Sequence, residues 1–236
     1  MVKMKRVFAI VILVGIGFWL ANGLSEIPFG HNKMIVGHYY LENVRAQTGA
    51  INTVTSVIVN YRGLDTLGEV TVLFIASTGV AALLWREDTG RVAETEGSLI
   101  LKTGSKILYP LILLFGVYIF VHGHLTPGGG FPGGAVIATA FLMLYLSYEE
   151  FDLSHKLLEM SEGTAGILYV SVGLIGLLIG GFFLFDWIWR VWEIGSVGNL
   201  VSAGYIPIIY IIIAVKVGTE LIGILDRMIK EPKEDL

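Results

Sequence analysis

Six apolar segments, of the length that a membrane-spanning helix needs, restrict what this chain can fold into. A helix needs roughly 20 mainly apolar residues to cross the hydrocarbon layer, because lipid offers the backbone no hydrogen-bond partners. The sequence therefore predicts an all-α, polytopic integral membrane protein with six transmembrane helices. The six segments run approximately over Val7–Leu24, Thr66–Trp85, Ile107–Val121, Phe131–Tyr148, Gly163–Phe185 and Asn199–Leu225.

The composition excludes soluble proteins and several kinds of chemistry. Of the 236 residues, 54% are hydrophobic and 15% are charged, whereas a soluble domain has about 25% charged residues. The net charge of -4 gives no basic patch for nucleic acid. The chain has no cysteine, which excludes disulfides, iron–sulfur clusters and thiolate metal sites within it. We expect no cofactor, no metal and no catalysis by this chain itself.

The charges that flank the segments predict the orientation. Lys3, Lys5 and Arg6 precede the first segment, as in a cleaved signal peptide. No small-x-small cleavage site follows, and Trp19 is placed like an interfacial anchor, so we interpret this segment as a retained span. Six spans return the chain to its starting side, which then carries most of the Lys and Arg residues. By the positive-inside rule both termini are cytoplasmic, and the expected localisation is the plasma membrane.

Two polar stretches divide the chain around these spans. Ser25–Asp65 is too long for a simple connector, and within it apolar residues recur at helical spacing over Ile51–Tyr61. This spacing predicts a weakly amphipathic helix along the membrane surface or against a neighbouring subunit, although its β-branched residues also suit a strand. Arg86–Lys106 is typical of a cytoplasmic linker. It predicts a two-span segment over residues 1–96 and a four-span domain over residues 97–236.

A charged cluster opens the second span. Arg62, Asp65, Thr66 and Glu69 share one helical face by their spacing. A charge within a span costs at least about 2.5 kcal/mol on insertion scales, so it needs a partner or a function. One hypothesis is that Glu69 exchanges a proton or helps to bind a hard cation, while Asp65 and Arg62 tune its charge. The alternative is an ion pair at the membrane edge that fixes the depth of the helix.

Lys216 and Glu220 form a second charged cluster, one turn apart in the last span. Lys216 is too far from either flank for its side chain to reach water easily. Burial destabilises the charged form of both groups, which suits a proton relay. The alternative is a structural pair, because a Lys and a Glu four residues apart on a helix neutralise each other in place.

The turn between the third and fourth spans, residues 122–134, contains six glycines and two prolines, which excludes a regular helix there. Histidine titrates near neutral pH, so His122 and His124 are candidates for a proton relay. A zinc site is disfavoured because no cysteine or carboxylate lies nearby. The other interpretation is a tight re-entrant turn in which small residues permit close backbone packing. Its structural residues are Pro127, Gly128, Gly129, Gly130, Gly133 and Gly134.

Two motifs resemble subunits of the multi-subunit Mrp-type sodium/proton antiporters. The turn His122–Gly134, followed by a small apolar helix, resembles the B subunit, as does Ser202–Pro207 at the start of the last span. This resemblance covers about residues 97–236. Tyr61–Leu73 is similar to a segment near the C-terminal end of the large A subunit of the same antiporters. The resemblance implies that Glu69 corresponds to the acidic residue of that segment and lies on an ion path.

A short two-span piece that resembles the A subunit, joined to a domain that resembles the B subunit, is not the usual layout of a free-standing antiporter. It resembles the membrane arm of archaeal respiratory complexes such as membrane-bound hydrogenases and sulfane sulfur reductases. The resemblance implies a non-catalytic subunit of an Mrp-like module that moves sodium or protons. Its partners would be other Mrp-like membrane subunits, the lipid bilayer and a hydrogenase-like or sulfur-reductase-like peripheral arm. A subunit of a free-standing antiporter and a purely structural scaffold are the alternatives.

Overall fold

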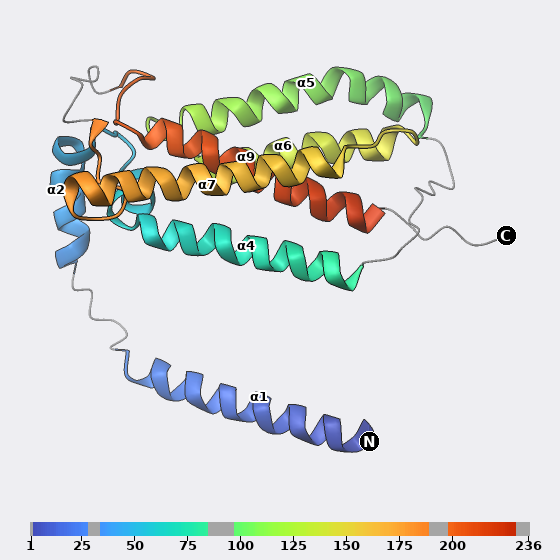
Figure 1. The fold of residues 1–236 in the computed structure, drawn as a ribbon, viewed down its shortest axis with the longest axis horizontal. Helices are drawn as coiled ribbons and strands as arrows, with labels where there is room; N and C mark the ends of the chain where they lie inside the picture. Colours follow the sequence, from blue (N-terminus) through green and yellow to red (C-terminus); the bar gives the residue numbers. More distant parts are fainter. Residues whose placement is uncertain (1, 28–33, 85–96, 189–197, 230–236) are drawn as a thin grey trace. The chain divides into compact units, whose positions relative to one another are not determined.

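The protein is a set of helices, seen in a computed structural model that describes residues 2–27, 34–84, 97–188 and 198–229 (Figure 1). Contacts divide the chain into residues 1–39 and residues 40–236, and each unit is described separately. In chain order the helices are α1 (Val2–Ser25), α2 (Ile35–Thr48), α3 (Thr53–Ser56), the π-helix η1 (Val57–Tyr61), α4 (Gly63–Leu83), α5 (Leu99–Val121), α6 (Gly130–Ser147), α7 (His155–Gly180) and α9 (Ile206–Ile229).

The six predicted spans are confirmed. Among the described residues, α1, α4, α5, α6, α7 and α9 are long and apolar enough to cross a membrane, and no strand is present there. The chain is therefore an all-α, multi-pass membrane protein. Much of the predicted linker Arg86–Lys106 lies outside the described residues, but its last part forms the start of α5.

The starts of α5 and α9 differ from the prediction. α5 begins earlier, at Leu99, because the Ser98 hydroxyl caps it by accepting a hydrogen bond from the Leu101 backbone N–H at 3.2 Å. α9 begins later, at Ile206, with Pro207 in its first turn, where a helix does not need the missing N–H. Hydropathy alone does not locate either start, because each depends on a local backbone signal.

The end of α7 also differs from the prediction. The helix ends at Gly180, whereas the predicted span continues to Phe185. Gly181 has a φ of 80°, a left-handed conformation that favours glycine and ends the helix. The chain then folds back, so that the rings of Phe183 and Phe185 occupy the space in front of Gly173 and Gly180. The segment that follows α7 thus covers the glycines in the second half of this helix, Gly173, Gly176 and Gly180.

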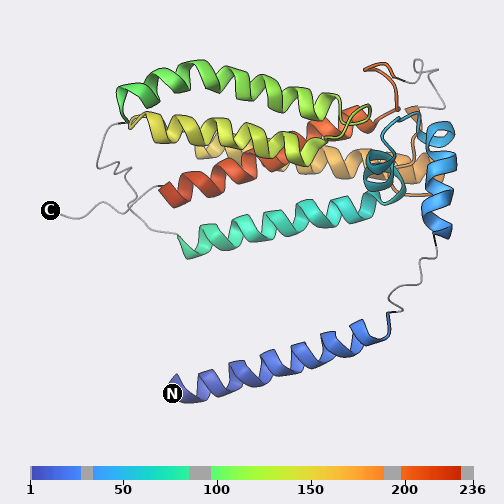
Figure 2. The same ribbon diagram turned by 180° about the vertical axis from the view of Figure 1, so that it is seen from behind.

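Helix α9 is the central helix of residues 40–236. Of its spanning segment 56% is buried, compared with 11% to 39% in α4, α5, α6 and α7. It contacts all four of these helices, and both ribbon views show it running between them (Figures 1 and 2). Most of its apolar side chains are buried, and only a stripe that includes Ile208, Ile211 and Val215 is exposed, so α9 forms the core of the bundle.

Glycines on α6 allow this helix to lie directly against α9. A Cβ at Gly134 would lie 2.7 Å from the carbonyl oxygen of Ala214, and one at Gly130 would lie 2.6 Å from the Cβ of Ile213. Gly129 has a φ of 151°, which favours glycine at the turn before the helix. The prediction that residues 122–134 exclude a regular helix is wrong for residues 130–134, which form the first part of α6.

We expect Gly134→Ala to lower the stability of the protein by about 1–3 kcal/mol, because the new methyl group meets backbone atoms of α9 that cannot move aside. Gly104→Ala in α5 is the control, since nothing lies within 4 Å of its new Cβ. This control should be neutral or stabilise the helix by up to about 1 kcal/mol. The unfolding temperatures of the two variants in detergent should therefore differ, and equal values would contradict the close contact of α6 with α9.

Candidate functional site

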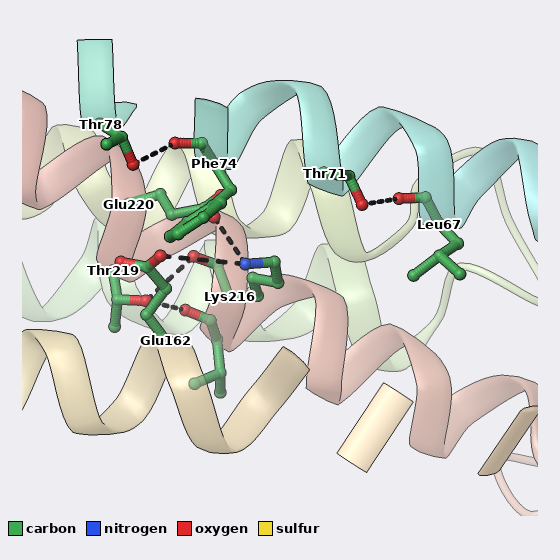
Figure 3. Close-up of polar contacts among 9 residues, drawn as sticks. Leu67, Thr71, Phe74, Thr78, Glu162, Lys216, Thr219 and Glu220 are labelled. Carbon is green, nitrogen blue, oxygen red and sulfur yellow. Dashed lines mark hydrogen bonds and ion pairs between the residues drawn. The ribbon is translucent and has the colours of Figure 1, made fainter. Parts of the chain in front are cut away.

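A buried ion pair lies in the interior of the bundle, on α9. The ammonium Nζ of Lys216 donates a hydrogen bond to Oε1 of Glu220 at 2.6 Å, and the residues are 8% and 1% exposed (Figure 3). Helical geometry causes this pairing, because residues four apart lie one above the other. The Glu220 Oε2 atom is buried and has no hydrogen-bond partner among the described residues. The site therefore has a free acceptor atom beside its cation.

A third charged group reaches the same site from α7. Oε1 of Glu162 lies 4.0 Å from the Lys216 ammonium, and the Glu162 side chain keeps 19% of its surface exposed. The ring of Phe74 on α4 lies 5.3 Å from the same ammonium. Lys216 is thus held by two carboxylates and an aromatic face, which come from three helices (Figure 3).

The charged cluster at the start of α4 has a different environment. Arg62 Nε donates a hydrogen bond to Asp65 Oδ2 at 2.5 Å, and these side chains are 63% and 54% exposed. Glu69 is also exposed, whereas Thr66 is buried and donates to the carbonyl oxygen of Ile58 at 2.8 Å. Within the predicted common face, Thr66 therefore lies on the buried edge and the three charged residues lie on the exposed side.

Two buried tyrosines fix η1 and the start of α4 to the core. The hydroxyl of Tyr169 on α7 donates to the carbonyl oxygen of Gly63 at 2.9 Å. The Tyr205 hydroxyl donates to the carbonyl oxygen of Leu184 and accepts from Nδ2 of Asn60, the latter at 3.1 Å. Burial raises the pKa of Tyr205 above its ordinary value, so this residue stays a neutral hydrogen-bonding group.

The turn that follows α5 is held by the segment around α3 and η1. This segment is helical, so the strand alternative is wrong, and its polar side chains point into the protein. Nδ2 of Asn52 donates to the carbonyl oxygens of Gly123 and Thr126 at 2.9 and 3.0 Å. Thr55 also donates to the Gly123 carbonyl, at 2.6 Å. The segment therefore supplies the hydrogen-bond donors that the irregular turn lacks.

The two histidines of this turn have separate environments. His122 is partly exposed, stacks on Tyr118 with 4.2 Å between ring centroids, and lies 3.1 Å from the Tyr118 carbonyl oxygen through Nδ1. His124 is fully buried, with Nε2 3.2 Å from the carbonyl oxygen of Asn199. Burial lowers the pKa of His124. Within the described ranges, no three His, Cys, Asp or Glu side chains are placed to hold a metal ion.

Two buried or partly buried acids fall outside the predicted spans. The predicted fifth span begins at Gly163 and so omits Glu162, whereas α7 begins at His155. Continuing the helical register toward the N-terminus would have identified Glu162. The predicted last span ends at Leu225 and so omits Asp226, which is buried in α9 and accepts a hydrogen bond from the Tyr145 hydroxyl at 2.7 Å.

The Lys216 site has the chemistry of a proton or cation station. Its three charged groups carry one positive and two negative charges when all are ionised, so one added proton or monovalent cation would neutralise it. The exposed Arg62–Asp65 pair is already neutral and lies in a high-dielectric environment, where such a pair stabilises little. The buried site is therefore the stronger candidate for ion chemistry.

Comparison with protein families covers most of the chain. Residues 100–223 match a family model described as a domain related to the MnhB subunit of Na+/H+ antiporter. Residues 2–95 match a second family model, which describes the E subunit of MBH. The two matches adjoin within the polar stretch Arg86–Lys106.

Known proteins confirm the predicted resemblances. The chain is 62% identical to a chain of the membrane-bound sulfane sulfur reductase, an archaeal respiratory membrane complex, with 97% of this chain and 99% of that chain covered and a TM-score of 0.79. It is 25% identical to a chain of the Mrp complex from Dietzia sp. DQ12-45-1b, covering 98% of this chain and 26% of that one, with a TM-score of 0.69. A probable A/B-type subunit of a K+/H+ antiporter from Rhizobium meliloti is 26% identical over 202 residues, which is 73% of this chain and 20% of the relative. The chain thus spans only about a quarter or less of those two antiporter chains.

The buried pair predicts a specific pattern of stabilities. Removing one partner of a buried ion pair costs about 3–5 kcal/mol, because the other charge is left uncompensated. We therefore expect Lys216→Met and Glu220→Gln each to lower the unfolding temperature of the assembled protein. The double variant Lys216→Met/Glu220→Gln should recover most of that loss. If the double variant lost as much as both single variants together, the two side chains would not be coupled.

The burial of His124 predicts a pH dependence of stability. Because its pKa is lowered in the folded protein, the unfolded chain binds the proton more readily. Stability is therefore complete above the ordinary histidine pKa of about 6.5 and falls as the pH decreases below it. The unfolding temperature should decrease between about pH 7.5 and about pH 5.5, and His124→Gln should reduce this decrease. His122→Gln is the control and should retain it.

Proposed function

Since the chain belongs to the family of domains related to the MnhB subunit of Na+/H+ antiporters, we propose that it is a non-catalytic membrane subunit of an Mrp-like sodium/proton-translocating module. The module belongs to a respiratory complex of the sulfane sulfur reductase type. The similarity to the reductase chain over almost the whole of both chains supports this assignment. The partners of this chain are other Mrp-like membrane subunits and a peripheral arm that carries out the redox reaction.

The observation that carries this proposal is the ion pair of Lys216 and Glu220 inside an apolar bundle. Taking two charges out of water costs several kcal/mol per ion, and the attraction between them often fails to offset that cost. Apolar residues of similar volume would hold α9 in the core equally well. Retaining charges at this depth is therefore best explained by ion movement through the site.

Glu69 is the second station of the proposed path. It is exposed on α4 in the separate chain, and a carboxylate within a span needs polar surroundings. We therefore expect a neighbouring subunit to cover it and to supply the next group on the path.

The turn that contains His122 and His124 follows the end of α5. It lies at the opposite end of the bundle from the C-terminal end of α9.

The two parts of the chain have separate ancestries in this proposal. Residues 1–96 form a two-span segment that is similar to the C-terminal part of an antiporter A subunit, and residues 97–236 form a four-span domain of the B type. Both termini are cytoplasmic, as the distribution of Lys and Arg predicts.

A structural role is the second candidate for part of the charged cluster on α4. The Arg62–Asp65 pair is closed and exposed, which favours a role in fixing the depth of α4 rather than in transport. A subunit of a free-standing antiporter would need the same buried site and differs only in its partners.

Transport by the assembled complex in proteoliposomes tests the proposal. We expect Glu69→Gln and Lys216→Met/Glu220→Gln each to reduce sodium or proton transport per redox turnover by about 100-fold, the scale of one lost acid–base group. Thr71→Val is the control on α4, because it also removes a polar group from an exposed position. Unchanged transport by both charge variants, with the complex fully assembled, would leave only the scaffold role.

A further inference from the structure

A cavity of about 320 Å3 opens beside the buried pair, at the end of the bundle where α4 and α9 end and α7 begins. The polar residues that line it are Ser77, Thr78, Glu159, Glu162 and Arg227. A cavity with this lining is large enough and polar enough to hold several water molecules.

Glu162 belongs to the cavity and to the buried site at the same time. Its side chain lines the cavity, and its Oε1 atom lies 4.0 Å from the Lys216 ammonium. The side chain of Glu220 has no exposed surface, whereas that of Glu162 keeps 19%. The cavity also touches Phe74, whose ring faces the Lys216 ammonium. Glu162 is thus the carboxylate through which the site meets the cavity.

We propose that the cavity is a water-filled access route for protons. Glu162 passes each proton between this water and Glu220, and it also serves as an alternate counter-ion of Lys216. This inference rests on the proposed function, because it gives that function its access route. Neither the geometry of the charged cluster on α4 nor the histidine turn is needed for it.

The proposed step balances in protons and charge. A proton from cavity water binds a carboxylate oxygen of Glu162, and the site becomes neutral with Lys216 paired to Glu220. Transfer of this proton to Oε2 of Glu220, the buried acceptor without a hydrogen-bond partner among the described residues, restores the Glu162 carboxylate. The Lys216 ammonium then exchanges its pairing from Glu220 to Glu162. Throughout the step, the ammonium stays beside one ionised carboxylate, so no isolated buried charge forms.

The groups around the site leave Glu162 as the connecting acid. From α7, Glu159 lies on the same side of the cavity one turn earlier, and from α9, Arg227 lies at its outer edge. From α4, the Phe74 ring faces the Lys216 ammonium, and Ser77 and Thr78 line the cavity. On the α6 side of α9, Tyr145 is hydrogen-bonded to Asp226, which also lies near His155.

Transport by the reconstituted complex gives the first test. We expect Glu162→Gln to reduce proton transport per redox turnover at least about tenfold, while assembly and redox activity are retained. Glu150→Gln is the control, because it makes the same change at an exposed position between α6 and α7, outside the cavity. Equal proton transport by the Glu162 variant and the wild type would overturn the inference. Loss of sodium transport alone, measured with a sodium tracer, would overturn the assignment of protons.

Water access gives the second test, which does not depend on transport. The chain has no cysteine, so any thiol label on this subunit reports only an introduced residue. Ser77→Cys in the cavity wall should react with a membrane-impermeant methanethiosulfonate reagent in the assembled complex, because water permits thiolate formation. The control is Gly79→Cys, two residues further along α4, where no atom of the chain lies within 4 Å of a new Cβ. This cysteine lies outside the cavity wall and should react much more slowly.

The two tests separate this inference from the proposed function. Loss of transport in Lys216→Met/Glu220→Gln, together with an unreactive Ser77→Cys, would retain the function and overturn the cavity as its access route. A reactive Ser77→Cys with unchanged transport in every charge variant would retain a wet cavity but overturn the proposed function and, with it, the role of Glu162. Equal labelling of Ser77→Cys and Gly79→Cys would also overturn the inference, because water would then surround α4 at that depth.

Discussion

An ammonium group inside an apolar bundle must have its charge neutralised at that place, and the site depends on this constraint. Water and mobile ions screen a charge at the surface, but neither is available in the core of five packed helices. The nearest solution on the same helix is a carboxylate four residues away, which Glu220 supplies to Lys216. The contact of α7 with α9 then adds Glu162 as a second carboxylate, which changes a static pair into a site with alternative pairings.

The two ends of the bundle have opposite polar organisation. At the end that contains the histidine turn, side chains such as Asn52 and Thr55 satisfy the exposed carbonyl groups, and His124 is buried among them. At the other end, the cavity next to Glu162 interrupts the packing. The buried charges therefore lie next to a polar cavity at one end of the bundle.

Close helix packing sets how deeply each helix of the bundle is buried. Glycine on α6 brings the backbones of α6 and α9 into direct contact, and α9 is the most buried of the spanning helices that the structure describes. In contrast, α4 keeps most of its surface exposed and carries Glu69 outward. Residues 40–236 therefore combine a buried charged site on α9 with an exposed carboxylate on α4. The similarity of the chain to parts of much longer antiporter chains agrees with such shared construction.

The sequence by itself determined the class of fold, the six spans and the pairing of Lys216 with Glu220, because each depends on local composition or on fixed helical spacing. It also identified the irregular turn that precedes Gly130, and it gave an ion pair of Arg62 with the nearby acids as one of two alternatives. Only the tertiary structure decided that Glu162 joins the buried pair, that α7 ends at Gly180, and that the polar side of the segment around α3 faces inward. Those features depend on contacts between helices that are distant in the chain. Hydropathy and periodicity describe one segment at a time, so they contain no information on which helices become neighbours.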